Sequence, residues 1–328
     1  MLRKYLTGFT APSSYDKVVQ LACKPKATLP KAKYLDPIIA ATWDSGALHE
    51  VCVALSSRFY DPNATVVFKA LIVLHTMIRN GNREGVLRSG SETLQLSHVS
   101  TRNYDHTSPA HLQNYAAYLD SRIQVYRNLE HDVIRMQSDA RATLAMNNMS
   151  PLRRGETRVG RKLRSMTVEE GLLRETRAVQ RMVDALVACR FYLDDLEDPL
   201  VLTALKMLVQ DLPILLEAEN EGVLNLLERF FDMSHVDATE ALTIYHNFCT
   251  TIELAIEYLG VARKQQFLLN VLIPNLKHPP ISLGGALQEY LDDPAFEQNR
   301  IEYRINKDAA RRGTWSWDSQ PTHTRPSF

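Results

Sequence analysis

The chain has 328 residues, of which 45% are hydrophobic, and its 38 Lys and Arg residues balance 38 Asp and Glu residues. This length and hydrophobic content suit a folded protein with a large core and exclude a chain that is disordered throughout. The four cysteines lie far apart without a CxxC pair, so we expect buried free thiols in a reducing compartment rather than disulfides.

Neither a membrane span nor a secretory signal is expected. No apolar run reaches the roughly 18 to 20 residues that a span requires, and the N-terminus lacks the long apolar core of a signal peptide. We therefore expect a cytoplasmic protein that meets membranes only when it is recruited to them.

Residues 1–12 have the pattern of a short amphipathic helix. Arg3 and Lys4 point away from an apolar face that spans about 100° of a helical wheel. That face consists of Leu2, Tyr5, Leu6 and Phe9. Two interpretations stay open: a helix that forms when this face inserts into a lipid interface, and an ordinary core helix.

The rest of the chain is expected to be all-α, because strand signals are almost absent and apolar residues recur every three or four positions. We predict a superhelical array of about ten antiparallel helices joined by short loops. The expected helices cover residues 14–22, 36–45, 46–59, 63–80, 83–89, 109–145, 167–191, 198–210, 212–233, 236–263 and 283–291.

Local start signals support two of these helices. Asp61-Pro-Asn63 is a typical N-terminal signal for the helix at 63–80. Thr167-Val-Glu-Glu170 is a capping box, in which the threonine and the last glutamate satisfy each other's backbone N–H groups. Pro213 lies where a helix start or a kink is expected.

Two polar segments divide the chain. Residues 147–165 hold six basic residues and one acidic residue without apolar periodicity, which predicts a basic loop between an N-terminal part, to about residue 146, and a C-terminal helical part, 166–296. Residues 297–328 are polar apart from two tryptophans, so we expect a largely disordered tail.

The positive charge is concentrated at one end. Residues 1–34 hold seven Lys and Arg residues against one acidic residue, and the segment Lys24–Tyr34 packs four lysines and two prolines into eleven positions. Pro25 and Pro30 disfavour helix at and before their positions, which predicts a stiff, extended connector. Such an asymmetry indicates an anionic partner that this end of the chain meets.

The helix after this segment begins either at Pro30 or at Pro37, and both alternatives stay open. In either case Lys31, Lys33 and Tyr34 lie at or just before a helix N-terminus. Free backbone N–H groups and the helix dipole favour phosphate there. Lysines are flexible point charges, so several lysines without an arginine suit a polyphosphorylated headgroup.

No catalytic or metal-binding pattern with usable spacing is present. The sequence lacks HExxH, GxGxxG, Walker, GxSxG and zinc-type Cys/His patterns, and its histidines at 106, 131 and 246 stand alone. The acidic residues at 194–198 suit a helix start. We therefore expect no enzyme, no cofactor and no metal.

Three segments carry a family resemblance. Leu21-Ala-Cys23, six further residues and Pro30-Lys-Ala-Lys-Tyr34 resemble the phosphoinositide signature of the ANTH domain, the membrane-binding module of clathrin-assembly adaptors. Residues 63–82 and 220–233 resemble landmarks of that family. The resemblance places an ANTH-like domain at 13–296, with an ENTH/VHS-like N-terminal part extended by further long helices, and the Lys-Tyr form is similar to fungal members.

The resemblance implies that Lys31, Lys33 and Tyr34 contact the headgroup of phosphatidylinositol 4,5-bisphosphate. Tyr34 replaces the histidine that many members have at this position. A phenol keeps its proton at neutral pH, so we expect binding to change little between pH 6 and 7.5.

Two positions depart from the signature. Leu21 stands where the signature has its first basic residue, and Cys23 stands at its Thr/Ile position. Lys24 and Lys26 are near enough in the sequence to supply the missing phosphate contact.

The resemblance also implies partners and a location. Relatives hold a vesicle SNARE helix in an apolar groove, and the matching positions are Leu227 and Ile252, for which plain core packing is the alternative. Clathrin and coat adaptors are expected to bind through regions absent from this chain, which has no Asn-Pro-Phe motif and no clathrin box. ENTH-domain adaptors are further expected partners, and the expected location is the cytosolic face of the plasma membrane and clathrin-coated pits or vesicles.

The main alternative is a helical peptide- or nucleic-acid-binding scaffold of the VHS or polymerase-tail-binding type without lipid specificity. The basic loop offers phosphate contacts to nucleic acid, although we do not expect nucleic acid as a partner. Binding to liposomes that contain the bisphosphate distinguishes the two hypotheses.

Overall fold

The computed structural model describes residues 14–96, 99, 109–149, 162–191 and 196–312. These residues form helices and no strands, which confirms the all-α prediction, with fourteen α-helices described where about ten were predicted. The helices are α1 (Ser14–Ala22), α2 (Ala32–Ala41), α3 (Ser45–Arg58), α4 (Ala64–Asn80), α5 (Arg83–Thr93), α6 (Pro109–Leu129), α7 (Val133–Met149), α8 (Lys162–Ser165), α9 (Leu172–Val187), α10 (Pro199–Arg229), the 3-10 helix η3 (Phe230–Asp232), α11 (His235–Lys264), α12 (Gln266–Leu269), α13 (Ile281–Asp292) and α14 (Phe296–Arg311).

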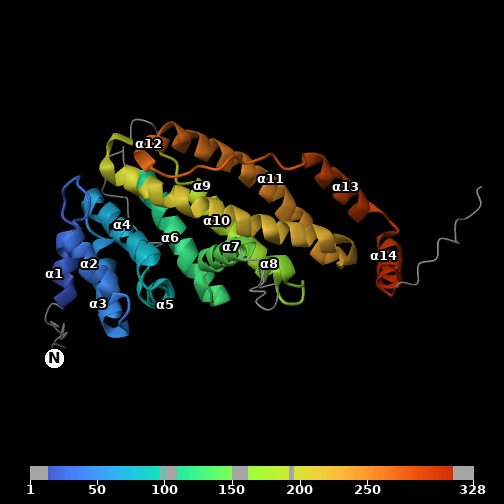
Figure 1. The fold of residues 1–328 in the computed structure, drawn as a ribbon, viewed down its shortest axis with the longest axis horizontal. Helices are drawn as coiled ribbons and strands as arrows, with labels where there is room; N and C mark the ends of the chain where they lie inside the picture. The colour runs from blue at the N-terminus through green and yellow to red at the C-terminus, as the bar shows by residue number, and fades with distance from the viewer. Residues whose placement is uncertain (1–13, 97–98, 100–108, 150–161, 192–195, 313–328) are drawn as a thin grey trace, which may run out of the picture.

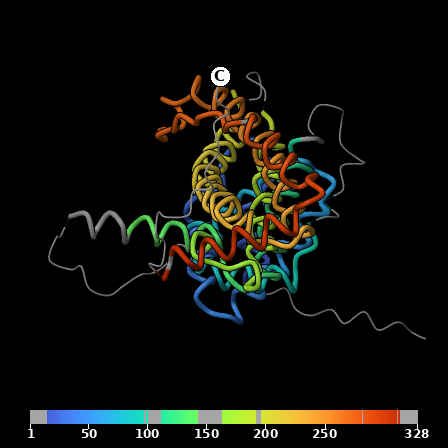
Figure 2. Tube along the Cα trace, turned by 90° about the vertical axis from the view of Figure 1, so that its right-hand side faces the viewer, coloured from blue at the N-terminus to red at the C-terminus, as the bar shows by residue number. Residues whose placement is uncertain are grey.

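The helices form an elongated array. Helices α1 to α5 gather at one end of the long axis, and α14 lies at the other end (Figure 1). Helices α10 and α11 run along most of this axis, and α10 packs against α9, α7, α11 and α4. Figure 2, in which the α14 end faces the viewer, shows α14 lying across the front of the molecule.

The predicted start signals act as expected. The Asn63 side chain caps α4 by accepting hydrogen bonds from the N–H groups of Thr65, at 3.0 Å, and Val66, at 3.4 Å. Thr167 and Glu170 exchange the two hydrogen bonds of a capping box, at 2.7 and 3.3 Å. They close a turn rather than the helix itself, because α9 begins five residues after the threonine.

Two predicted boundaries were wrong. The expected helix at 109–145 is divided into α6 and α7, and Glu130 takes a left-handed conformation at the break, with a φ of 59°. The expected helices at 198–210 and 212–233 form the single helix α10, which contains Pro213. Leu212 and Leu215 are fully buried on either side of this proline, so apolar packing holds the helix together across it.

The basic loop and the tail also differ from the predictions. Helix α7 extends into the segment 147–165 and α8 closes it, while residues 150–161 lie outside the described part of the chain. The tail predicted to be disordered from residue 297 is helical over Phe296–Arg311, because Phe296 is buried and Tyr303 packs on Phe231 with ring centroids 5.5 Å apart.

The helix α10 is long and apolar enough to cross a membrane by length and composition, contrary to our expectation from the sequence. However, 61% of its apolar window is buried against the rest of the described structure. This burial is typical of a core helix in a folded domain.

A buried polar cluster joins the N-terminal helices to α10. The Asp211 carboxylate on α10 accepts hydrogen bonds from Tyr118, at 2.7 Å, and from Arg122, at 3.0 Å, both on α6. Arg79 at the end of α4 pairs with the same carboxylate. Burial opposes ionisation of Asp211, but Arg122 and the other donors outweigh it and hold the pKa of this carboxyl well below its usual range.

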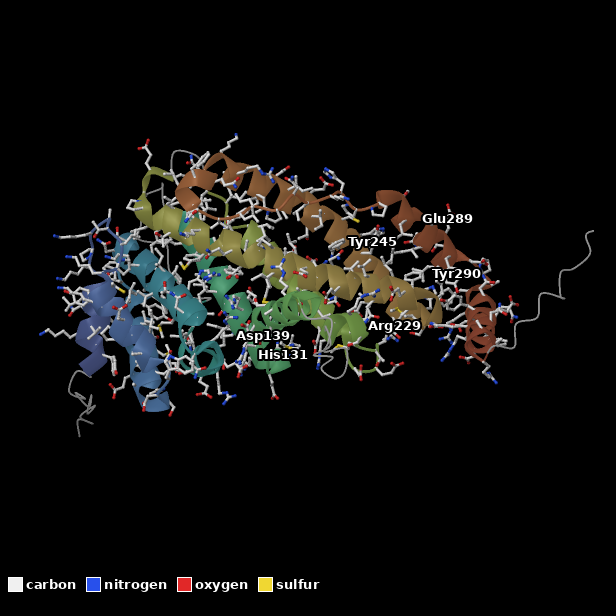
Figure 3. The ribbon with its side chains drawn as sticks, viewed as in Figure 1. His131, Asp139, Arg229, Tyr245, Glu289 and Tyr290 are labelled. Carbon is white, nitrogen blue, oxygen red and sulfur yellow. The ribbon has the colours of Figure 1, made fainter. Side chains whose placement is uncertain are left out.

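The C-terminal helices are joined by aromatic contacts. Tyr290 on α13 meets Phe231 edge-on, with ring centroids 4.8 Å apart, and also contacts Phe296 at 5.3 Å. Tyr245 on α11 donates a hydrogen bond of 2.7 Å to the Pro280 carbonyl just before α13. Figure 3 shows Tyr245 and Tyr290 on these neighbouring helices.

Candidate functional site

The lysine segment covers the connection between α1 and α2 and the first residues of α2, and we refer to residues 24–33 as the lysine connection. The N–H of Lys26 donates to the Lys24 carbonyl at 2.8 Å, and the N–H of Thr28 donates to the Lys26 carbonyl at 2.7 Å. These are two consecutive three-residue turns. The part of the segment before α2 is therefore non-helical, as expected, but it bends twice instead of running straight.

The four lysines of this connection all point into solvent. Lys24, Lys26, Lys31 and Lys33 are exposed, whereas Pro30 between them is buried. A buried proline with exposed neighbours fixes the backbone and leaves the ammonium groups free to meet a ligand.

The helix α2 begins at Ala32, which agrees with the earlier of the two predicted starts. Its N-cap residue Lys31 is extended, with φ and ψ of −72° and 139°, and its side chain makes no capping hydrogen bond. The Tyr34 N–H donates to the Lys31 carbonyl at 2.9 Å. No side chain caps the N–H groups of Ala32 and Lys33, and the dipole of α2 favours negative charge beside them.

Tyr34 lies in this first turn and is half-buried. The Lys33 Nζ lies 5.0 Å from the centroid of the Tyr34 ring, within the range of a cation–π interaction. The ring therefore supports the ammonium group that is expected to contact phosphate.

Below the connection lies a lysine that the sequence analysis missed. Lys69 of α4 is 2% exposed, and its Nζ donates a hydrogen bond of 3.0 Å to the Lys24 carbonyl. Burial lowers the pKa of Lys69, the nearby Cys23 opposes this shift and Lys24 adds to it. The sequence does contain a signal for this buried lysine: Lys69 is a single charged residue between Phe68 and Ala70, in an otherwise apolar run.

The two departures from the signature have structural counterparts. Cys23 is 1% exposed, and burial raises the pKa of its thiol to about 12, against the influence of Lys69. Cys23 is therefore a core residue and no ligand. Leu21 is half-buried, and Lys24 is the first basic residue that follows it in the chain.

The remaining predicted residues lie elsewhere. Ile252 on α11 is 6% exposed, and the partly buried Leu227 on α10 packs against the same core. The structure therefore places both in the C-terminal helices and not at the lysine connection. The predicted insertion residues Leu2, Tyr5, Leu6 and Phe9 lie outside the described residues.

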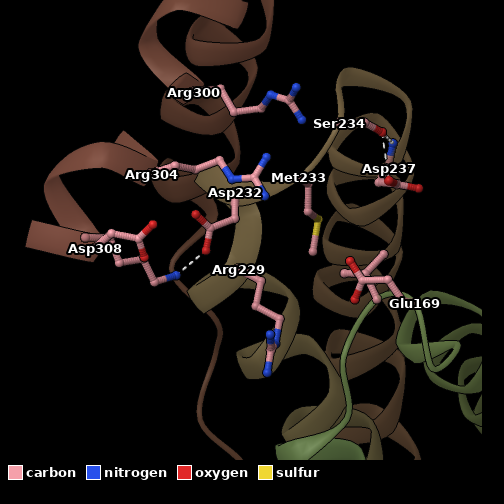
Figure 4. Close-up of a pocket in the computed structure, with 11 residues that line it drawn as sticks. Glu169, Arg229, Asp232, Met233, Ser234, Asp237, Arg300, Arg304 and Asp308 are labelled. Carbon is pink, nitrogen blue, oxygen red and sulfur yellow. Dashed lines mark hydrogen bonds and ion pairs between the residues drawn. The ribbon is translucent and has the colours of Figure 1, made fainter. Parts of the chain in front are cut away.

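A polar cavity of about 410 Å³ lies at the other end of the molecule, between α14 and the α10–α11 turn. Arg300 and Arg304 of α14 line it together with Arg229 and Asp232 (Figure 4). Its lining holds four basic and four acidic side chains, so it lacks the excess positive charge of a polyphosphate site. Among the described residues no group of three or more His, Cys, Asp or Glu side chains is placed to hold a metal ion.

The fold and this site define a class: an all-helical array that presents a cluster of lysines at the first turn of its second helix. No other connection between described helices combines a free helix start with four exposed lysines. The chain belongs to the ANTH domain family, whose profile matches residues 14–293.

Similar proteins agree with this assignment. The chain is 34% identical over 295 residues to an ENTH domain-containing protein of Schizosaccharomyces pombe, covering 90% of this chain and 42% of that protein. It is 34% identical over 290 residues to the clathrin coat assembly protein AP180B of Saccharomyces cerevisiae, covering 87% of this chain and 47% of that one. The chain thus spans less than half the length of these relatives.

A solved structure shows the same fold. Helical ANTH and ENTH tubules on membranes containing phosphatidylinositol 4,5-bisphosphate include a chain that matches with a TM-score of 0.55 at 15% identity. The match covers 88% of this chain and 98% of the other.

Proposed function

We propose that this protein binds phosphatidylinositol 4,5-bisphosphate through Lys31, Lys33 and Tyr34, and that Lys24 and Lys26 supply the phosphate contact that Leu21 cannot make. The observation that carries this proposal is the exposure of all four lysines on one short connection at the uncapped start of α2. The solved tubules, whose membranes contain this lipid, support the choice of ligand.

The charge of the site suits reversible recruitment. Each basic residue near an anionic leaflet contributes on the order of 1 kcal/mol, so four lysines supply several kcal/mol that salt weakens. This attraction holds the protein at a membrane for a limited time and does not anchor it permanently. The chain acts by binding and not by catalysis.

The proposed role is that of an endocytic adaptor that recruits or assembles clathrin coats on the cytosolic face of the plasma membrane. The name of the yeast relative AP180B, a clathrin coat assembly protein, supports this role. The proposal includes clathrin, coat adaptors and ENTH-domain adaptors as partners, and coated pits and vesicles as the location. The N-terminal residues Leu2, Tyr5, Leu6 and Phe9 are included as a helix that inserts into the bilayer.

A second binding function is proposed for the C-terminal helices. Leu227 and Ile252 lie on α10 and α11, and α13 packs against α11. A vesicle SNARE helix that displaced α13 would meet this apolar surface. The test measures the affinity of the Leu227→Ser variant for the SNARE helix, after thermal melting has shown that the variant is as stable as the wild type. An unchanged affinity overturns the proposal.

The lipid proposal is tested by co-sedimentation with liposomes that contain or lack the bisphosphate. We expect the wild type to bind only the former, and Lys31→Glu/Lys33→Glu to lose most of this binding. Arg174→Glu/Arg181→Glu, which makes the same charge change at exposed positions of α9, is the matched control and should keep it. Equal binding of the wild type and Lys31→Glu/Lys33→Glu overturns the proposal, and binding without lipid preference supports the peptide- or nucleic-acid-binding alternative.

A further inference from the structure

The connection between α11 and α13 carries three large apolar side chains that project into solvent. Phe267, Leu268 and Leu272 have exposed fractions of 101%, 63% and 86%. Single exposed apolar residues are common on protein surfaces, but a group of this size within six positions marks an interaction surface. We refer to these three side chains as the α12 tip.

The backbone beneath the α12 tip is fixed. Leu269 is fully buried and Ile273 is 8% exposed, so the connection is fastened to the core between the projecting side chains. Arg263 donates hydrogen bonds to the Pro274 carbonyl, at 3.2 Å, and to Asn275 Oδ1, at 2.9 Å, which holds the two arms of the connection together. The apolar side chains are therefore presented outward by a stable scaffold.

The charged residues in the chain segment that carries the α12 tip are all basic. Residues 258–288 contain three basic residues and no acidic residue. These residues, Arg263, Lys264 and Lys277, are all exposed.

The last two acidic residues before this segment are already paired. Glu253 lies 2.6 Å from His278 Nδ1, and Glu257 lies 3.7 Å from Arg190. Both carboxylates therefore have partners, and the apolar side chains of the tip are flanked in the chain by exposed basic residues.

The α12 tip lies toward the end of the molecule that carries the lysine connection. Figure 1 shows α12 beside the start of α10, at the end of the long axis opposite α14. Thr76 of α4 contacts Met207 of α10, at 3.9 Å, so this part of α10 is joined to the N-terminal helices. The α12 tip and the lysine connection therefore lie in the same half of the long axis.

We propose that the α12 tip inserts into an anionic lipid surface as a second membrane contact. The projecting side chains need no complementary cavity in a fluid interface, and the cationic surroundings attract acidic headgroups. The inference rests on the proposed function, because membrane binding at the lysine connection brings the tip to the bilayer.

The test measures affinity for vesicles of phosphatidylcholine and phosphatidylserine, with and without phosphatidylinositol 4,5-bisphosphate. We expect Phe267→Ser/Leu272→Ser to weaken vesicle binding about tenfold, since insertion of each side chain removes apolar surface from water. Affinity for soluble inositol 1,4,5-trisphosphate should be unchanged, because the lysine connection is intact. The control is Val236→Ser, which removes an apolar side chain that is 75% exposed at the start of α11.

Unchanged vesicle binding by the double variant overturns the inference. The inference is also overturned if the double variant loses self-association in sedimentation but keeps vesicle binding, because the tip then contacts a second copy of the chain. If the wild type does not bind inositol 1,4,5-trisphosphate but binds both kinds of vesicle equally, and Phe267→Ser/Leu272→Ser loses this binding, the proposed function fails while the inference about the tip stands.

A second measurement covers the case in which the double variant does not fold. A nitroxide on Phe267→Cys, in a Cys249→Ser background, should become accessible to lipid-soluble oxygen when vesicles are added. Continued exposure to a water-soluble relaxation agent overturns the inference.

Discussion

His75 Nε2 of α4 lies 2.9 Å from Asp211 Oδ2 of α10, although the two residues stand 136 positions apart in the chain. Burial lowers the pKa of His75 and outweighs the opposing effect of Asp211, so the imidazole stays neutral beside an ionised carboxylate. The neutral ring then donates from Nε2 to Asp211 and accepts at Nδ1 from the Tyr115 hydroxyl, at 2.8 Å. Both ring nitrogens are thereby satisfied at the junction of the N-terminal helices with α10.

Removing this carboxylate should destabilise the protein strongly. Asp211→Ala leaves Arg122, which is 2% exposed, without its main counter-charge, and we expect the free energy of unfolding to fall by about 3 to 5 kcal/mol. Urea denaturation measures the change. Asp139→Ala, at a carboxylate that is 65% exposed, is the control and should stay within about 0.5 kcal/mol of the wild type. Similar effects of the two substitutions would contradict the role of the buried cluster.

A second buried acid predicts a stability that decreases with rising pH. Burial raises the pKa of Glu219 to about 8, although the Gln180 amide donates to it at 3.0 Å. Between the unfolded pKa of about 4.3 and the folded pKa, the folded state binds a proton that the unfolded state lacks, so stability is lost as pH rises through this range.

Glu219→Gln removes this titration. Its free energy of unfolding, relative to the wild type, should rise by roughly 2 to 3 kcal/mol between pH 6 and pH 8.5. Urea denaturation at the two pH values provides the measurement. Glu228→Gln, at a side chain that is 60% exposed, should show no such trend. A constant difference between Glu219→Gln and the wild type would show that Glu219 does not titrate in this range.

Replacing Tyr34 by histidine should make headgroup binding depend on pH. The wild type has no imidazole at this position, so its affinity for inositol 1,4,5-trisphosphate should change little between pH 6 and 7.5. In Tyr34→His the imidazole gains a positive charge near the lower pH, and affinity should be several-fold higher at pH 6 than at pH 7.5. Titration calorimetry measures both proteins. A steep loss of wild-type binding across this range argues against Tyr34 as a ligand.

Loss of the buried lysine should loosen the lysine connection. In Lys69→Met the Lys24 carbonyl loses its 3.0 Å hydrogen bond, and we expect faster amide hydrogen exchange at Lys26 and Thr28. Headgroup affinity should fall about three- to tenfold, because less ordered lysines lose more entropy on binding. Lys206→Met on α10 is the control. Unchanged exchange at Lys26 and Thr28 would mean that Lys69 does not hold the connection.

Two glycines in long helices should respond in opposite ways to alanine. A Cβ at Gly222 of α10 would lie 2.5 Å from Oγ1 of the buried Thr176 on α9, so Gly222→Ala should lower the free energy of unfolding by about 1 to 3 kcal/mol. A Cβ at Gly260 of α11 meets nothing within 4 Å. Gly260→Ala should therefore raise this free energy by about 0.5 to 1 kcal/mol. Thermal melts compare the two variants, and destabilisation of both by the same amount would rule out close packing as the cause.

Much of the fold could be predicted from local pattern. Apolar periodicity predicted most of the helices, and the cap at Asn63 and the box at Thr167 formed as expected, because these interactions depend on neighbours in the sequence. The helix predictions that were wrong concerned positions where contacts between residues far apart in the sequence determine the structure. Glu130 ends α6 without a glycine or proline, and α14 forms because Phe296 and Tyr303 pack on aromatic residues of α10–α13.

The candidate site was predictable to a similar degree. The lysines and prolines at 24–34 were visible as composition, and the structure places all four lysines in solvent. Lys69 was not predicted as part of the site, because it lies far along the sequence and only tertiary packing brings its ammonium group to the Lys24 carbonyl. The α12 tip was missed because its residues lie between two expected helices and only the structure shows that their side chains face outward.

The length of α10 determines how far α14 lies from the proposed lipid contacts. With 31 residues, this helix extends for about 46 Å, and the His75–Asp211 contact joins its first half to α4, in the part of the molecule that carries the lysine connection. In the proposed membrane-bound state, the lysine connection and the α12 tip contact the bilayer, and α10 extends from this region toward α14 at the other end of the molecule. In this proposed arrangement α10 acts as a rigid spacer that sets the distance between α14 and the lipid.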